Sequence, residues 1–77
     1  MIFEHSFSNG NRVAIDLTSV RYVVLEHRED ASEITFHFKG LVKSDNSGLV
    51  FNGKDHETRS NTVYEEILKG LKGENTL

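Results

Sequence analysis

The chain has 77 residues, which is enough for one small domain and too few for two. Nine Lys and Arg residues against twelve Asp and Glu give a formal net charge of −3, and the basic residues are spread along the whole chain. Proteins that bind nucleic acids usually carry a surplus of positive charge, so this composition disfavours that class. The chain has no cysteine, which excludes disulfides, thiol nucleophiles and zinc sites built on cysteine.

The hydropathy pattern gives no sign of a membrane segment. The longest apolar run covers only residues 22–25, far below the roughly 20 residues that a membrane-spanning helix needs. The first residues lack the basic and apolar segments of a secretory signal, so we expect a cytoplasmic protein.

Short segments rich in Val, Ile, Phe and Tyr alternate with clusters of Asn, Asp, Ser and Gly. This pattern is typical of strands joined by tight turns. We expect strands near residues 2–7, 12–17, 20–28 and 33–39, followed by a pair near 41–43 and 49–51. The sequence therefore predicts an antiparallel meander of about five to six strands.

The register of the first hairpin depends on the length of its loop. A two-residue turn at Asn9 and Gly10 would leave Phe3 and Phe7 on the face opposite to Ile15. An odd-length loop reverses this, because a slip of one residue moves every side chain of a strand to the other face. We expect the odd-length loop, which gathers one apolar face from Phe3, His5, Phe7, Val13, Ile15 and Leu17.

The second hairpin has the clearest alternation. If Arg28 pairs with Glu33, Leu25 lies opposite Phe36, and the apolar and polar faces separate without a bulge. In this register one face carries Val23, Leu25, Ile34, Phe36 and Phe38, and the other carries Tyr22, Val24, Glu26, Thr35, His37 and Lys39.

From Thr62 onward the period changes to that of a helix. Thr62 and Glu65 fit a capping box, and Gly73 is a suitable residue to end the helix. The apolar stripe of this helix consists of Val63, Ile67, Leu68 and Leu71.

These elements predict an α+β fold, in which an antiparallel meander carries one C-terminal helix on its apolar face. One domain covers residues 1–73, and residues 74–77 form a frayed tail. We expect a core of Val13, Ile15, Leu17, Val23, Leu25, Ile34, Phe36, Phe38, Leu49, Phe51, Ile67, Leu68 and Leu71.

The residue types that carry chemistry form no recognisable motif. The histidines at 5, 27, 37 and 56 lack spacings that prepare a metal site, and the neighbours of His56 in its predicted loop point apart. The glycines form no phosphate-binding run, and no serine lies in a nucleophile elbow. A small sheet with one helix also offers little depth for a pocket. We expect no catalytic residue, no metal and no cofactor.

The polar face of the second hairpin carries one functional hint. Tyr22 and Val24 lie there beside His37 and Lys39, which makes a small adhesive patch on a face expected to meet water. Such patches often mark protein contacts, and tyrosine is favoured in them. We expect a small non-enzymatic protein-interaction module, with a second copy of the chain or another protein as partner. It would act through this face or through an open sheet edge.

Two other functions stay open. A nucleic-acid-binding regulatory protein would need Arg12, Arg21, Lys39 and Lys43 to gather beside Tyr22. A small-molecule or metal-binding domain would use the histidines.

Overall fold

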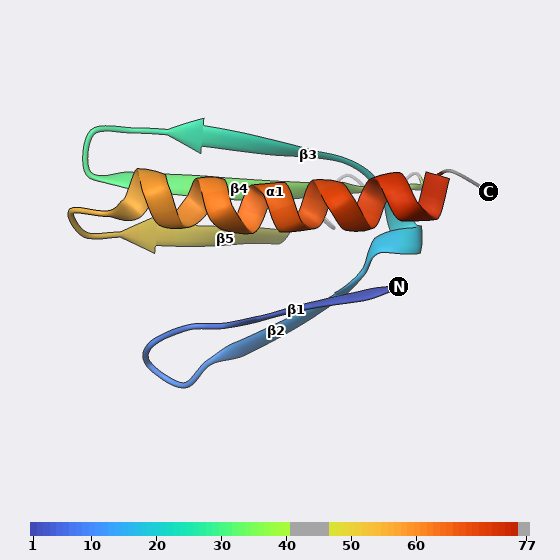
Figure 1. Ribbon diagram of the computed structural model, residues 1–77, viewed down its shortest axis with the longest axis horizontal. Coiled ribbons are helices and arrows are strands. Elements are labelled where there is room, and N and C mark those ends of the chain that lie inside the picture. The colour runs from blue at the N-terminus through green and yellow to red at the C-terminus, as the bar shows by residue number, and fades with distance from the viewer. Residues whose placement is uncertain (41–46, 76–77) are drawn as a thin grey trace.

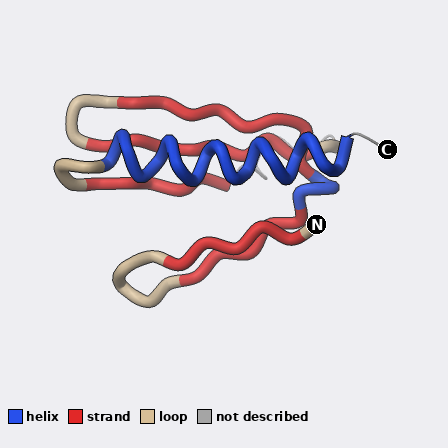
Figure 2. Tube along the Cα trace, viewed as in Figure 1, coloured by secondary structure: helices blue, strands red, loops and turns tan. Residues whose placement is uncertain are grey.

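A computed structural model describes residues 1–40 and 47–75 of the chain (Figures 1 and 2). Within these residues it has the predicted α+β class, with five antiparallel strands and one C-terminal helix. The expected strand near 41–43 lies outside the described residues. The elements are β1 (Ile2–Ser6), β2 (Arg12–Asp16), the 3-10 turn η1 (Leu17–Ser19), β3 (Val20–His27), β4 (Ala31–Phe38), β5 (Ser47–Asn52) and α1 (His56–Asn75).

The described strands form two sheets, where the sequence predicts one meander. β1 and β2 make a separate hairpin, and β3, β4 and β5 pair in that order. The turn η1 separates the sheets. Asp16 caps η1 by accepting hydrogen bonds from the Thr18 hydroxyl (2.6 Å) and amide (3.1 Å), which hold the pKa of Asp16 below its usual value. Leu17 in the same turn is buried, so η1 anchors the hairpin to the rest of the fold.

The first hairpin has the odd-length loop that the sequence predicts. Phe3 lies opposite Ile15, and the Phe7 amide donates to the Asn11 carbonyl at 2.7 Å, which leaves three residues in the loop. The last of these, Gly10, has a φ of 93°, a conformation that favours glycine and suits three-residue hairpins.

The predicted register of the second hairpin is wrong by two residues. Leu25 lies opposite Ile34, and the Arg28 amide donates to the Ala31 carbonyl at 2.7 Å, so the loop has only two residues. Because a shift of two keeps every side chain on its face, the predicted faces survive. Arg28 still reaches Glu33, diagonally, at 3.3 Å.

A bulge at the start of β3 changes one face assignment. Val20 lies opposite Phe38 and Tyr22 opposite His37, so Arg21 is an extra residue in the ladder. Val20 is therefore buried in the core although Tyr22, two positions later, is exposed. Strict alternation places both on the same face, which is why the predicted core omits Val20.

The helix begins earlier and ends later than the sequence predicts. α1 runs from His56 to Asn75 and passes through both Thr62 and Gly73. The Thr62 hydroxyl donates to the Thr58 carbonyl at 3.0 Å, as in a helix interior, so the predicted capping box is wrong. Two of the four predicted tail residues continue the helix, and the other two lie outside the described residues.

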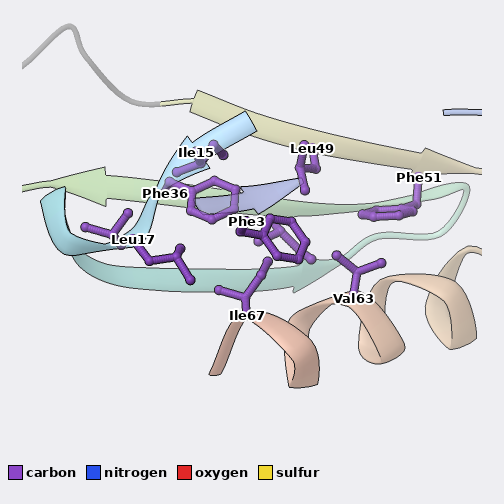
Figure 3. Close-up of a cluster of buried hydrophobic side chains, with 10 residues drawn as sticks. Phe3, Ile15, Leu17, Phe36, Leu49, Phe51, Val63 and Ile67 are labelled. Carbon is purple, nitrogen blue, oxygen red and sulfur yellow. The ribbon is translucent and has the colours of Figure 1, made fainter. Parts of the chain in front are cut away.

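The core lies where α1, the three-stranded sheet and the β1–β2 hairpin meet (Figure 3). α1 packs against β3, β4 and β5 and also contacts η1. Leu68, which we expected in the core, is only half-buried and lies outside this cluster. The buried hydrophobic residues are Phe3, Ile15, Leu17, Val20, Ile34, Phe36, Leu49, Phe51, Val63 and Ile67.

Candidate functional site

The structure brings the predicted interaction residues to one face of the three-stranded sheet. The rings of Tyr22 and His37 stack in parallel, with centroids 4.3 Å apart and planes at 15°. Val24 is the next outward residue of β3, and the exposed Lys39 follows the end of β4. The register places Tyr22, Val24 and His37 on one side of the sheet, with Tyr22 opposite His37 and not opposite Lys39.

Val50 extends this surface onto the third strand. It lies opposite Glu33, on the side of the sheet that also carries Val24. Tyr22, Val24 and Val50 are 48%, 43% and 46% exposed. The sequence already indicates that Val50 points outward. Leu49 and Phe51 both point inward, and successive side chains of a strand alternate between its two faces. We call Tyr22, Val24, His37, Lys39 and Val50 the open face.

No described element covers the open face. α1 packs on the opposite side of β3, β4 and β5, where the inward side chains of the sheet form the core. The face is charged differently at its two ends. Glu26 and Glu33 share Arg28 at the β3–β4 turn, with N–O distances of 2.7 and 3.3 Å. The other end carries His37 and Lys39.

A cleft of about 580 Å³ forms the second candidate site. It lies between the loop of the β1–β2 hairpin, the end of β5 and the first turns of α1. We expected little depth for a pocket in so small a fold. The cleft exists because the hairpin is a separate sheet whose loop supplies a wall of its own.

Aromatic side chains line one side of the cleft. His5 meets Phe7 edge to face, with ring centroids 4.7 Å apart, and lies 5.5 Å from Phe51. These are the separations and tilts that aromatic pairs favour. Phe51 is buried, while His5 and Phe7 are half-buried, so parts of the latter two rings remain open to the cleft.

Arg59 supplies the positive charge of the cleft. Its Nε donates to Asp55 Oδ1 at 2.9 Å, and its Nη2 donates to the Asn52 carbonyl. Its guanidinium also lies over the Phe51 ring, 5.9 Å from the centroid. These contacts hold an exposed arginine in one orientation at the mouth of the cleft.

Burial lowers the pKa of His5, and the charge of Arg59 lowers it further against the opposing effect of Glu66. The ring is therefore mainly neutral at pH 7 and offers one hydrogen-bond donor and one acceptor.

A histidine–serine–histidine cluster, in which Ser32 and His56 are buried and His27 is exposed, joins the β3–β4 turn to the start of α1. Ser32 Oγ lies 2.6 Å from His27 Nδ1 and 2.7 Å from His56 Nδ1, and His56 Nε2 lies 3.3 Å from the Glu29 carbonyl. We expected a His56 in a loop and at least partly exposed, and this is wrong: it is buried at the first position of α1. Ser32 was the missed signal, because it is a polar residue on the apolar face of β4.

The hydrogen bonds of this cluster have a fixed direction when both rings are neutral. The Glu29 carbonyl can only accept, so His56 carries its proton on Nε2 and accepts at Nδ1. Ser32 then donates to His56 and accepts from His27 Nδ1. Although a serine beside histidines resembles a nucleophile with its base, Ser32 has no exposed surface, so a substrate cannot reach it. The cluster joins two elements of the fold.

The basic residues named for nucleic-acid binding do not gather on one face. Arg12 lies on β2, where it pairs with Glu4 at 3.5 Å, whereas Arg21 and Lys39 belong to the other sheet, and Lys43 lies outside the described residues. Within residues 1–40 and 47–75, no three His, Asp or Glu side chains are placed to hold one metal ion. In the same ranges no helix has the length and apolar character to cross a membrane.

Comparison with known proteins finds no similar family model, no similar curated protein and no similar solved structure.

Proposed function

We propose that this chain is a small non-enzymatic protein-interaction module of the cytoplasm, and that its open face pairs with the open face of a second copy. One observation carries the proposal. The described residues include five large hydrophobic side chains that are exposed, and three of them, Tyr22, Val24 and Val50, share this face. Exposed apolar residues that gather in one patch mark interaction surfaces, whereas scattered ones need no explanation.

Sheet packing explains why this face favours a partner. A sheet that meets water on one side is stable when that side is polar. Here the two outer strands carry Val24 and Val50, and Gly48 of β5 adds no polar side chain. The outward residues Glu33 and Thr35 of the middle strand lie between them. Covering these groups with a second sheet removes apolar surface from water.

The charges of the face favour a second copy over an arbitrary partner. A two-fold axis that runs across the strands level with the Val23–Phe36 row reverses the strand ends between the copies. The acidic end with Glu26 and Glu33 then meets the end that carries Lys39 in the other copy. Opposite charges face each other twice by symmetry, which fixes the orientation of the pair.

The size of the face predicts weak pairing. Three strands of this length present roughly 300 Å² of sheet surface, while a stable interface buries about 800 Å² on each partner. We expect a dimer with a dissociation constant on the order of 0.1 mM. The chain also has no cysteine, so the fold does not use disulfides, which suits a reducing compartment such as the cytoplasm.

Sedimentation equilibrium of variants tests the proposal. The double variant Tyr22→Ala/Val24→Ser should weaken association at least about tenfold while the thermal midpoint stays nearly unchanged, because both side chains are exposed in the monomer. Ile2→Ser is the matched control, since Ile2 is also exposed but lies on the β1–β2 hairpin. Equal association of the double variant and the wild type would reject the open face.

A charge swap tests the orientation. Glu26→Lys and Lys39→Glu should each weaken the dimer, because each places like charges opposite each other. The combined variant should restore much of the association, because the two changes compensate across the axis. Additive losses in the combined variant would rule out the proposed arrangement of the copies.

A further inference from the structure

The cleft beside α1 offers a second site with different chemistry. The cleft shares Val50 with the open face, and the other open-face residues lie outside it. Its volume of about 580 Å³ lies within the roughly 300–1,000 Å³ of small-molecule sites. We infer that the cleft binds a planar aromatic acid, with one or two rings lying against His5 and Phe7 and a single carboxylate on Arg59.

The aromatic wall selects the planar body of the ligand. His5 and Phe7 already form an edge-to-face pair, and the Phe51 ring lies 5.5 Å from His5 and 6.5 Å from Phe7. An additional flat ring extends this cluster with the same geometry, since aromatic rings favour offset and edge-to-face contacts. The half-buried state of His5 and Phe7 leaves part of each ring for this contact.

The guanidinium of Arg59 selects the acid group. Its contacts with Asp55 and the Asn52 carbonyl use two of its five N–H groups, so donors remain for a carboxylate. A guanidinium fork matches a carboxylate in shape and charge. Arg59 is the one side chain with a fixed charge among the described lining residues, because His5 is mainly neutral at pH 7. The site therefore has room for one negative charge and not for several.

Asp55 limits the affinity of the cleft for anions, so a variant at this position should tighten binding where a variant of Arg59 should weaken it. Its carboxylate lies 2.9 Å from Arg59 Nε and competes with any anion. Replacing Asp55 by Asn removes this competing charge. Position 55 is the N-cap of α1, because its carbonyl accepts the first helical hydrogen bond, from the Arg59 amide. Asn is also a favoured N-cap residue, so this substitution should preserve the start of the helix. An acid should then bind more tightly, whereas a neutral aromatic molecule should not respond.

NMR titration of the full chain with 2-naphthoate and its neutral counterpart 2-naphthamide tests the inference. We expect 2-naphthoate to shift the signals of His5, Phe7 and Arg59 with a dissociation constant of about 0.1–1 mM. The amide should bind at least about fivefold more weakly. Arg59→Met should weaken naphthoate binding about tenfold and leave the amide unchanged, and Asp55→Asn should tighten naphthoate binding about threefold.

Controls separate the site from general effects of charge and folding. Arg12→Met removes another exposed arginine, outside the cleft, and should leave both affinities unchanged. If Arg59→Met does not fold, Asp55→Asn decides alone, because the inference requires its affinity for naphthoate to rise. Equal affinity for the acid and the amide would overturn the inference. So would shifts confined to residues outside the cleft, or an unchanged affinity in Asp55→Asn.

Discussion

Ser32 and His56 lie 24 positions apart in the sequence, yet Ser32 Oγ and His56 Nδ1 meet at 2.7 Å in the interior of the protein. The contact links β4 to the first residue of α1, and His27 completes it from β3. Three elements are therefore joined by one hydroxyl group. This polar cluster lies at the end of the fold where the helix begins, next to Phe51 at the edge of the apolar core.

Ser32→Ala should lower the free energy of unfolding by about 1–3 kcal/mol, because it leaves Nδ1 of the buried His56 without its partner. Ser60→Ala is the matched control: Ser60 is equally buried, but its hydroxyl donates only to the Glu57 carbonyl of its own helix. We expect the control to cost less than about 1 kcal/mol, since alanine favours the helix. Urea unfolding measures both, and equal losses would show that the cluster adds no stability.

The two histidines of the cluster should occupy opposite tautomers in their neutral forms. We expect the proton on Nδ1 of His27 and on Nε2 of His56, because the Glu29 carbonyl fixes the direction of the whole chain of hydrogen bonds. Long-range ¹⁵N–¹H NMR correlations distinguish the tautomers. A proton on Nδ1 of His56 would contradict this order.

The start of α1 was missed because its buried face is polar there. The buried helix positions are 56, 60, 63, 67 and 70, which follow one continuous helical stripe. The first two are His56 and Ser60 and the last is Gly70, so a search for apolar periodicity sees only the centre of the stripe. The helix extends to His56 because tertiary contacts satisfy these residues, which no local rule reveals.

Sheet register was predictable where one face is buried. The odd-length loop of the first hairpin followed from gathering Phe3 and Ile15 on one side. In the second hairpin the burial pattern fixed the faces but not the pairing, since a two-residue shift leaves both faces intact. The same limit applied to function. The sequence predicted the Tyr22 face, while the cleft required knowing that the first hairpin is a separate sheet.

Two glycines of α1 should respond to alanine in opposite directions. A Cβ at Gly70 would lie 2.5 Å from Leu17 Cδ1, a side chain buried in the core, so Gly70→Ala should destabilise the fold by about 1–3 kcal/mol. A Cβ at Gly73 meets nothing within 4 Å. Gly73→Ala should stabilise the helix by about 0.5–1 kcal/mol. Thermal unfolding measures whether each variant is more or less stable than the wild type. Stabilisation by Gly70→Ala would contradict the close packing of α1 on η1.

The stability of the protein should depend on pH through His5. Because burial lowers its pKa in the folded state below the ordinary value of 6.5, the unfolded chain binds a proton more readily. Stability is therefore lost as the pH falls through 6.5, and the loss levels off below the folded pKa. Arg59 adds to this effect, and Glu66 opposes it.

His5→Phe keeps an aromatic ring beside Phe7 but removes the titrating group. Urea unfolding between pH 5 and pH 8 should give a flatter stability curve for this variant than for the wild type. Parallel curves would show that His5 does not contribute to the pH dependence.

Pairing of the open face is the central claim, and the mass of the wild-type chain in solution tests it most directly. Light scattering over a concentration range from about 10 µM to 1 mM brackets the expected dissociation constant. We predict that the mass rises from 8.7 kDa toward twice that value across this range. A mass that stays at 8.7 kDa up to the highest concentration would contradict pairing between copies.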